Sequence, residues 1–505
     1  MTLLIALLLG VISAFAFQPV GFWPLMPLAF AGLFELLARA PTQRRAIGLG
    51  WWFGVGQFCL GLNWIATAFT FQAAMPAWLG WIAVVALSLY LAVYPMLATG
   101  IAWRIGKARP AVLVVALAGA WIVNEWLRAT MFTGFAWNPV GVSLTDTPLL
   151  NASGWIGTYG LGALVVLSGG ALWLAWRRSF RAAALTAAAV LAFMLVPAST
   201  LQPKGTPRPI RIVQPNIGQD VKWRPGFADA ASAKLNALTR PRDHRQELIF
   251  WPEAAVTEPL SDNRPGAGSY IGQERAQTTA AVADRDLLLT GGIALRSKDG
   301  RIPDSVANSV FVLGPGGRFI GRYDKAHLVP YGEYLPMRPI LSAIGLSRLA
   351  PGVGDFDAGA GPSTLALPDG WGKAGFQLCY EIIFSGHVVD RANRPDFLFN
   401  PSKDAWWAPG AAAAPRPGAA ARRRGGHSCR PLHPDRNQRP GRRARPDHRV
   451  APVAPRRDHL GRPAAPRRCA EPVRALRQFD PAVPRARAAY RGDCTAPGPP
   501  LKRAI

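Results

Sequence analysis

The most informative stretch of this chain is Ala374-Gly375-Phe376-Gln377-Leu378-Cys379-Tyr380-Glu381. A short apolar run that ends in polar residues is typical of a buried strand. Cys379 is therefore expected at the end of a strand, where its thiol can meet residues from other strand ends. Catalytic groups concentrate at such positions, since a rigid scaffold holds them and solvent can reach them.

Two charged residues occupy similar places upstream. Glu253 ends the strand-like run 248–253, and Lys325 stands within residues 322–330. In covalent acyl transfer a thiolate attacks a carbonyl, a carboxylate moves the proton and an ammonium stabilises the oxyanion. Glu253, Lys325 and Cys379 supply these three groups, and we take them as the candidate catalytic residues.

The first 200 residues are expected to form a membrane bundle. Of the 505 residues, 50% are hydrophobic and 18 are tryptophan, and a chain of this length holds two or three domains. Up to about residue 200, long apolar runs with sparse charge predict a polytopic membrane region. Seven spans are predicted, at residues 3–17, 21–37, 49–69, 78–101, 112–126, 155–176 and 182–196.

The first span has a rival interpretation as a cleaved signal peptide. It is about 15 residues long, against the usual ~20 for a span. However, no Lys or Arg precedes Arg39, so the charged region that begins a signal peptide is missing. A retained first helix is therefore favoured.

Basic residues orient the predicted bundle. They gather in the loops after the second, fourth and sixth spans, and the other connections have few. By the positive-inside rule these loops are cytoplasmic, so the chain after residue 200 faces outward, to the periplasm of a two-membrane bacterium. The basic residues concerned are Arg39, Arg44, Arg45, Arg104, Lys107, Arg109, Arg177, Arg178 and Arg181.

Residues 205–407 are expected to form an α/β domain. Strand-like runs lie at 210–214, 247–251, 286–295, 309–313, 319–321, 375–380 and 396–400, and helical stretches at 228–239 and 268–283. Residues 314–317, with the sequence GPGG, predict a hairpin between two of the strands. Strands that alternate with helices indicate a layered α/β domain, and about 200 residues can bury a core of their own.

Four motifs in this domain resemble those of the nitrilase (carbon-nitrogen hydrolase) superfamily. They are Trp251-Pro252-Glu253, residues 323–333 (YDKAHLVPYGE), Cys379-Tyr380-Glu381 and residues 400–406 (NPSKDAW). With a membrane bundle in front of them, residues 1–407 resemble the apolipoprotein N-acyltransferases. The resemblance implies an α-β-β-α sandwich for the outward domain.

The resemblance also implies a reaction and a location. A phospholipid gives an acyl chain to the thiol, and lysophospholipid leaves. The α-amine of a diacylglyceryl-cysteine in an apolipoprotein then attacks the thioester. The implied location is the bacterial inner membrane, with a multi-pass bundle and a periplasmic catalytic domain. No cofactor or metal is expected, because no phosphate loop, zinc-spaced His/Cys set or dinucleotide fingerprint occurs in the sequence.

The motifs carry roles over to particular residues. Cys379 is the implied nucleophile, Glu253 the general base and acid, and Lys325 the oxyanion partner. Glu333 resembles the family's second active-site glutamate and is expected to position Lys325.

Further residues receive supporting roles. Tyr380 and Glu381 are expected to line the site beside the nucleophile. Trp223 matches a tryptophan near the lipid entrance, with core packing as the alternative. His327 is expected to be structural and to bond within its own loop. Glu125, a carboxylate inside a predicted span, indicates a helix contact or a headgroup site, and the helix contact is favoured.

Residues 408–505 break the pattern. They hold 23 Lys and Arg against six Asp and Glu, with almost no apolar periodicity. A natural disordered tail, a nucleic-acid-binding tail and a reading-frame shift near codon 408 are the three explanations. An outer-face location and the near absence of aromatics, apart from Phe479 and Tyr490, argue against nucleic acid as a partner.

The frame shift is favoured among these three. Strings of Arg, Pro, Ala and Gly are what a GC-rich gene gives when it is read out of frame. The family resemblance implies a helix, further strands and an eighth span in this place, and none is visible. The chain as written is therefore expected to be inactive or degraded, because unpaired strand edges promote misfolding.

Two other functions remain open from the sequence. A membrane-anchored amidase would use the same three residues with water as the acceptor. A transporter with an accessory outer domain would need charged residues along a path through the bundle, and few are present.

Overall fold

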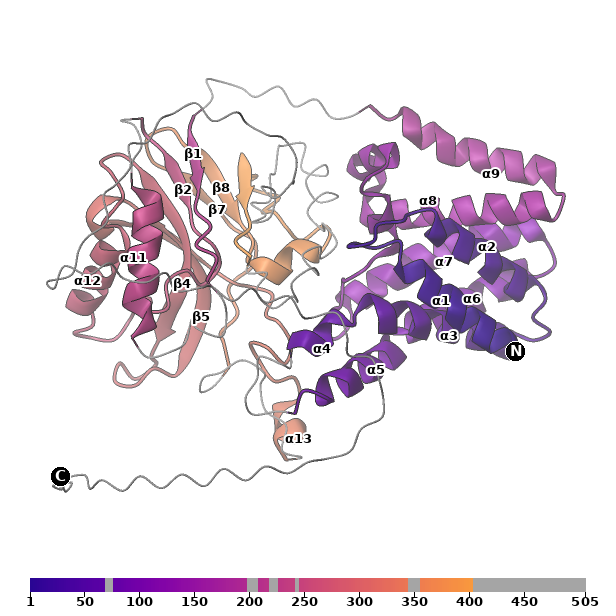
Figure 1. Cartoon of the computed structure of the whole chain (residues 1–505), viewed down its shortest axis with the longest axis horizontal. Coiled ribbons are helices and arrows are strands. Elements are labelled where there is room, and N and C mark those ends of the chain that lie inside the picture. The colour runs from indigo at the N-terminus through magenta and orange to yellow at the C-terminus, as the bar shows by residue number, and fades with distance from the viewer. Residues whose placement is uncertain (69–75, 198–207, 218–225, 241–244, 344–354, 403–505) are drawn as a thin grey trace, which may run out of the picture. The chain divides into compact units, whose positions relative to one another are not determined.

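The computed structural model of the chain describes residues 1–68, 76–197, 208–217, 226–240, 245–343 and 355–402. A helical N-terminal region is followed by a region of mixed helices and strands, which confirms the predicted fold class (Figure 1). The expected tail (408–505), Trp223 and the end of the fourth motif lie outside the described residues.

The N-terminal region is a bundle whose helices overlap the predicted spans. Among the described residues, Leu79–Gly106, Pro110–Thr130 and Pro148–Trp176 are long and apolar enough to cross a membrane. The predicted span 78–101 is divided between α5 and α6. The helices are α1 (Thr2–Ala14), α2 (Leu25–Ala38), α3 (Gln43–Gly61), α4 (Trp64–Ala68), α5 (Leu79–Leu91), α6 (Val93–Gly106), α7 (Pro110–Thr130), α8 (Ser153–Trp176) and α9 (Phe180–Ala192).

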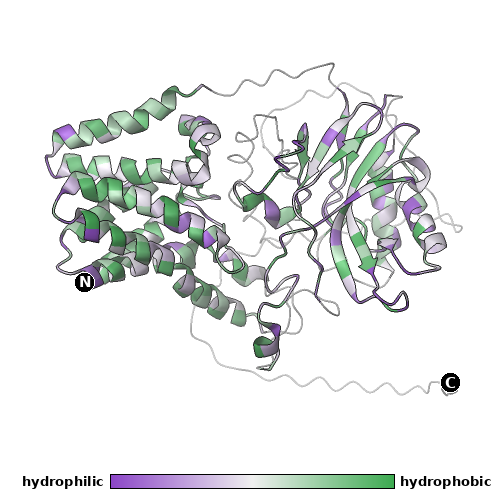
Figure 2. Ribbon diagram, turned by 180° about the vertical axis from the view of Figure 1, so that it is seen from behind, coloured by the Kyte–Doolittle hydropathy of each residue, from purple (hydrophilic) through white to green (hydrophobic). Residues whose placement is uncertain are grey.

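Hydrophobic residues predominate along the helices of the bundle (Figure 2), and many of them are exposed. Trp81, Val115 and Trp155 are all more than half exposed, which suits a surface that faces lipid. Inside, small residues let helices approach closely. A Cβ added at Gly10 would lie 2.0 Å from the Phe53 carbonyl oxygen, so α1 and α3 pack backbone to backbone, as membrane helices often do.

The three basic loops lie at one end of the bundle. Glu35, near the end of α2, accepts hydrogen bonds from Arg39 (2.5 Å) and from Trp173 of α8 (2.8 Å). Trp103 of α6 donates to the Ala40 carbonyl at 3.2 Å. The C-terminal ends of α2, α6 and α8 are therefore neighbours. Since α7 begins at Pro110 beside this end, it finishes at the opposite end of the bundle.

The α/β region is built from two packed sheets. In the larger sheet β1, β2 and β4 are parallel, β4, β5 and β6 are antiparallel, and β3 also pairs with β4. In the smaller sheet β8 lies between β7 and β9. The strands are β1 (Ile210–Ile212), β2 (Leu248–Phe250), β3 (Pro259–Asp262), β4 (Leu287–Arg296), β5 (Ser305–Leu313), β6 (Phe319–Asp324), β7 (Thr364–Leu367), β8 (Gly372–Phe376) and β9 (Phe397–Phe399).

Alternation along β2 separates the two layers of the core. Leu248 and Phe250 pack toward the smaller sheet, against Phe376 and Phe399. Ile249 packs on the other face, with residues of α11 (Phe227–Thr239). This period of two places a helical layer on one face of the larger sheet and the smaller sheet on the other. Helix α12 (Gly268–Thr278) joins α11 in the outer layer (Figure 1).

Candidate active site

Lys325 lies directly after β6 and is almost completely buried, with 1% of its surface exposed. Its Nζ lies 2.9 Å from Oε1 of Glu333. Its backbone is fixed on both sides, since its N–H donates to the Asn308 carbonyl (2.8 Å) and its own carbonyl accepts from the Gly359 N–H (2.7 Å). A buried ammonium is costly unless it is paired and hydrogen-bonded, and Glu333 supplies that pairing.

Three negative groups act on the Lys325 ammonium. Burial lowers the pKa of Lys325, but the charges of Glu333, Glu253 and the Cys379 thiolate raise it by more. The net shift is upward, so the side chain stays cationic at neutral pH. The structure thus brings Glu253 and Cys379 within electrostatic reach of Lys325.

Asn308 of β5 bridges two carboxylates of the site. Its Nδ2 donates to Oε1 of Glu253 (3.1 Å) and to Oε1 of Glu333 (3.0 Å). Oε2 of Glu333 accepts the Val329 N–H at 2.9 Å. The sequence reasoning missed Asn308. Its signal was an amide in β5, the strand that precedes β6 and Lys325 in the chain.

Glu253 lies in the turn that follows β2. The next residue, Ala254, has a left-handed backbone with a φ of 46°. The turn closes tightly onto β4, because a Cβ added at Gly291 would lie 2.5 Å from the Ala254 nitrogen. Glycine at position 291 therefore lets the carboxylate approach the sheet.

Cys379 stands on a strained turn after β8. The predicted strand 375–380 ends at Phe376, and Cys379 has a φ of 48°. Such a backbone costs a non-glycine residue about 1–3 kcal/mol and persists only where neighbours enforce it. The Cys379 N–H donates to the Pro401 carbonyl (3.0 Å), and Asn400 Nδ2 donates to the Gln377 carbonyl (2.8 Å). The turn places the half-buried Cys379 three residues beyond the end of β8.

Glu381 is a buried residue whose carboxylate bonds to both the loop of Lys325 and the loop of Cys379. Only 4% of its surface is exposed. Burial raises the pKa of Glu381, while backbone N–H groups act in the opposite direction. Its carboxylate accepts from the Leu378 N–H (2.7 Å), the Ala326 N–H (2.8 Å), the His327 N–H (2.9 Å) and the Tyr323 hydroxyl (2.9 Å). One side chain therefore fixes both loops.

Tyr380 and His327 reach out of the α/β region to the bundle. The Tyr380 hydroxyl donates to the Gly134 carbonyl at 3.1 Å, and His327 Nε2 lies 3.0 Å from the Thr133 carbonyl oxygen. The His327 ring stacks on Phe384 with 3.7 Å between centroids. His327 thus bonds to a loop of the bundle. The sequence had led us to expect a bond within its own loop, and the structure corrects this prediction.

Neither described cysteine forms a disulfide, and among the described residues no group of three His, Cys, Asp or Glu could hold a metal ion. The site offers a thiol, two carboxylates and an ammonium. This set suits proton transfer, nucleophilic attack and oxyanion stabilisation.

Two family models match the chain. The model described as apolipoprotein N-acyltransferase N-terminal domain covers residues 9–171, and the carbon-nitrogen hydrolase model covers residues 210–432. The second match runs past residue 407, where we had expected the resemblance to end.

Several curated relatives are similar over most of their length. An apolipoprotein N-acyltransferase from Allorhizobium ampelinum is 32% identical over 429 residues, which cover 80% of this chain and 78% of the relative. One from Chromobacterium violaceum is 34% identical over 412 residues, which cover 80% and 76%. One from Sinorhizobium fredii is 32% identical over 433 residues, which cover 80% and 78%.

Proposed function

The chain belongs to the apolipoprotein N-acyltransferase family, and from that premise we propose how it transfers an acyl chain. The donor is a phospholipid, the carrier is a thioester on Cys379, and the acceptor is the N-terminal amine of a diacylglyceryl-cysteine in an apolipoprotein. An acyltransferase activity and a lipoprotein acceptor accord with the names of the relatives.

One observation carries the proposal. The Lys325 ammonium is buried, forms an ion pair with Glu333 at 2.9 Å and interacts electrostatically with Glu253 and Cys379. A fixed cation in a site shielded from water stabilises an oxyanion more strongly than it would in solution. The same cation favours the thiolate, which is the reactive form of cysteine.

In the first half-reaction Glu253 takes the proton of the Cys379 thiol. The thiolate attacks the ester carbonyl of the phospholipid, and Lys325 faces the oxyanion of the tetrahedral intermediate. When this intermediate collapses, the carbon–oxygen bond to the glycerol breaks. Glu253 returns the proton to the leaving oxygen, and lysophospholipid departs while the acyl chain stays on sulfur.

In the second half-reaction the acceptor amine attacks the thioester carbonyl. Glu253 takes a proton from the amine, Lys325 again faces the oxyanion, and the carbon–sulfur bond breaks. The products are an amide and the Cys379 thiolate, which regains its proton from Glu253. Glu333 and Asn308 hold Lys325 and Glu253 in place during both steps.

We further propose a multi-pass bundle in the bacterial inner membrane with the catalytic domain in the periplasm. The basic loops gather at the bundle end where α2, α6 and α8 finish. The α/β region contacts the loop after α7, at the other end. If the basic end is cytoplasmic, the catalytic domain lies outside, next to the lipid ester groups of the outer leaflet.

The test is to trap the acyl-enzyme. The protein with its downstream reading frame restored is purified, incubated with a phospholipid that carries an isotope-labelled acyl chain, quenched in acid and analysed by peptide mass spectrometry. We expect the label on Cys379 and none in Cys379→Ala. Adding a diacylglyceryl peptide should discharge the label onto the peptide amine. Hydrolysis of small amides without any acyl label on Cys379 would contradict the proposal and favour the amidase.

A further inference from the structure

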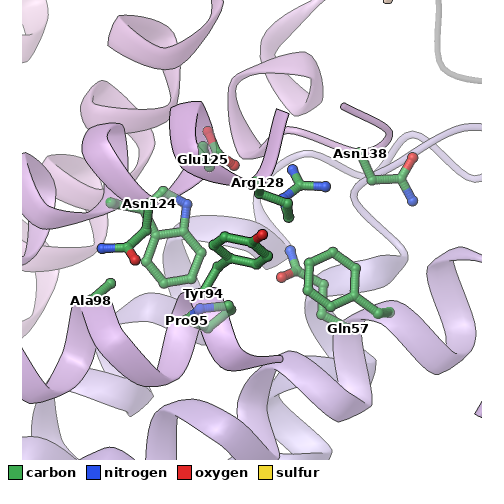
Figure 3. Close-up of a pocket in the computed structure, with 10 residues that line it drawn as sticks. Gln57, Tyr94, Pro95, Ala98, Asn124, Glu125, Arg128 and Asn138 are labelled. Carbon is green, nitrogen blue, oxygen red and sulfur yellow. The ribbon is translucent and has the colours of Figure 1, made fainter. Parts of the chain in front are cut away.

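Arg128 is a buried cation within the membrane bundle. It lies near the C-terminal end of α7 and only 3% of its surface is exposed. It lines a small cavity together with Glu125, Asn124 and Asn138 (Figure 3). Charged side chains at membrane depth are costly, and those that persist mark functional sites or specific contacts.

Arg128 and its neighbours fix the loop of residues 131–139. Arg128 Nη1 donates to the carbonyls of Phe135 (3.0 Å) and Trp137 (2.6 Å). Glu125 Oε1 accepts the N–H of Val140 at 2.7 Å, just beyond the loop. Asn138 Nδ2 donates to the Gly61 carbonyl at 2.9 Å. Three polar side chains therefore hold this short loop and its end.

The loop is held in a strained form. Phe132, Gly134 and Asn138 have φ values of 56°, 67° and 51°. A side chain at position 134 would meet the Ala129 carbonyl oxygen at 2.5 Å and the Phe384 ring at 3.1 Å. Left-handed non-glycine residues persist where the surroundings over-determine them, and they cluster at functional sites.

The same loop receives the two anchors of the catalytic loops. Thr133 and Gly134 present their carbonyls to His327 and Tyr380. Tyr380 directly follows Cys379, and His327 is two residues beyond Lys325. Ala129 and Ala136 of the bundle pack in one apolar cluster with Tyr380, Ile383 and Phe384. A further contact, from Thr158 of α8 to Ser385, is 2.7 Å long.

We propose that Arg128 is a positioning residue of the active site. By fixing the loop 131–139 it sets the anchors of Tyr380 and His327, and through them the separation of Cys379 from Lys325. The bundle thereby takes part in building the catalytic site. This inference rests on the proposed role of Cys379, but its test needs no acyl donor.

The test measures alkylation of Cys379 by iodoacetamide in the full chain, in membranes, from pH 6 to pH 9, with peptide mass spectrometry to separate the cysteines. Arg128→Met should lower the alkylation rate at pH 7 about tenfold and move the half-maximal pH upward, because Lys325 is no longer held at its place beside the Cys379 thiolate. Arg128→Lys, which keeps the charge, should fall between. The matched control is Arg104→Met, an exposed arginine of α6, which should leave the profile unchanged.

Cys59, half-buried in α3, reports on the bundle in the same samples. If Arg128→Met makes Cys59 more reactive, the bundle has loosened, and the alkylation of Cys379 in that variant is not interpretable. The double variant Tyr380→Phe/His327→Phe is then used as the test instead. That variant removes both anchors without changing the bundle and should give the same shift. Combining it with Arg128→Met should then add no further loss.

An unchanged Cys379 alkylation profile in the double-anchor variant would overturn the inference. It would also be overturned if combining Arg128→Met with that variant multiplied the two reductions in alkylation rate. The variants could show the expected shift in Cys379 alkylation while the parent chain never forms an acyl-enzyme. That outcome would leave the inference standing and reject the proposed function instead.

Discussion

Glu333 and Lys325 form a buried ion pair, with 2.9 Å between Oε1 and Nζ. Replacing a buried pair by apolar residues is often neutral or stabilising, whereas removing one partner costs about 3–5 kcal/mol. Stability alone therefore does not account for this pair. Its consequence is a cation of fixed position beside Cys379 and Glu253.

Glu333→Gln should lower acyl transfer by about 100-fold and shift its pH dependence. Without Glu333, burial lowers the pKa of Lys325 against less opposition, so the ammonium is lost at a lower pH. We therefore expect the alkaline limb of the pH–rate profile to move to lower pH. Because the folded pKa of Lys325 is raised above its ordinary 10.5, its stabilising contribution is present below 10.5 and is lost as the pH rises through the folded value.

Asp284→Asn is the matched control for this substitution, since Asp284 is an exposed carboxylate of the same domain. It should leave both the rate and the alkaline limb unchanged. A Glu333→Gln variant with a reduced rate but an unmoved alkaline limb would show that Glu333 does not act through the charge of Lys325.

Asn308→Ala should reduce kcat by about 10- to 100-fold, because Glu253 and Glu333 each lose a hydrogen bond that positions them. Asn308 contacts Glu253 and Glu333, so we expect KM for the phospholipid to change little. Asn308→Asp should be worse, since it adds a third negative charge. Steady-state kinetics on both variants decide this, and a rise in KM at constant kcat would place Asn308 in substrate binding instead.

We expect His327 to make the contact between the α/β region and the bundle sensitive to pH. Burial is the main cause that lowers the pKa of His327, and the charge of Lys325 adds to it. Its stabilising contribution is therefore complete above the ordinary value of 6.5 and is lost as the pH falls toward the folded value. The thermal midpoint of the detergent-solubilised chain should drop between pH 7 and pH 5.5, by less in His327→Gln. Equal drops in both proteins would count against His327 as the group that titrates.

The sequence pointed to candidate catalytic residues, but it did not point to the residues that hold them in position. Cys379, Glu253 and Lys325 stand in contiguous motifs, so spacing and residue type were enough to select them. Asn308, Arg128 and the loop 131–139 act through contacts with residues far away in the chain. Arg128 and Phe135 are local, but the contact from Gly134 to Tyr380 spans 246 positions, and no local pattern encodes it.

The fold shows the same limit. The strands of the predicted list are present, and each begins from a run rich in apolar residues. The sequence did not reveal β3 and β7. Strand β3 begins with a proline and has the sequence PLSD, and β7 is the short strand Thr364–Leu367. Both are edge elements whose pairing depends on a neighbouring strand rather than on their own residues.

The tail gives the last prediction. The match to the Allorhizobium relative covers 80% of this chain and 78% of that protein, so both chains extend beyond it. In this chain residues 408–505 hold 23 Lys and Arg with almost no apolar periodicity. We expect that resequencing codons 395–420 will reveal a frame shift, and that another frame downstream will encode strands and an apolar span of about 20 residues.

The restored protein should acylate a diacylglyceryl peptide faster than the chain as written, because the strand edges of the sandwich would be paired. Peptides of the Arg/Pro/Ala tail in protein isolated from its native cells would refute the frame shift. The candidate catalytic residues, all of which precede residue 408, would then have to act in a domain that ends differently from those of its relatives.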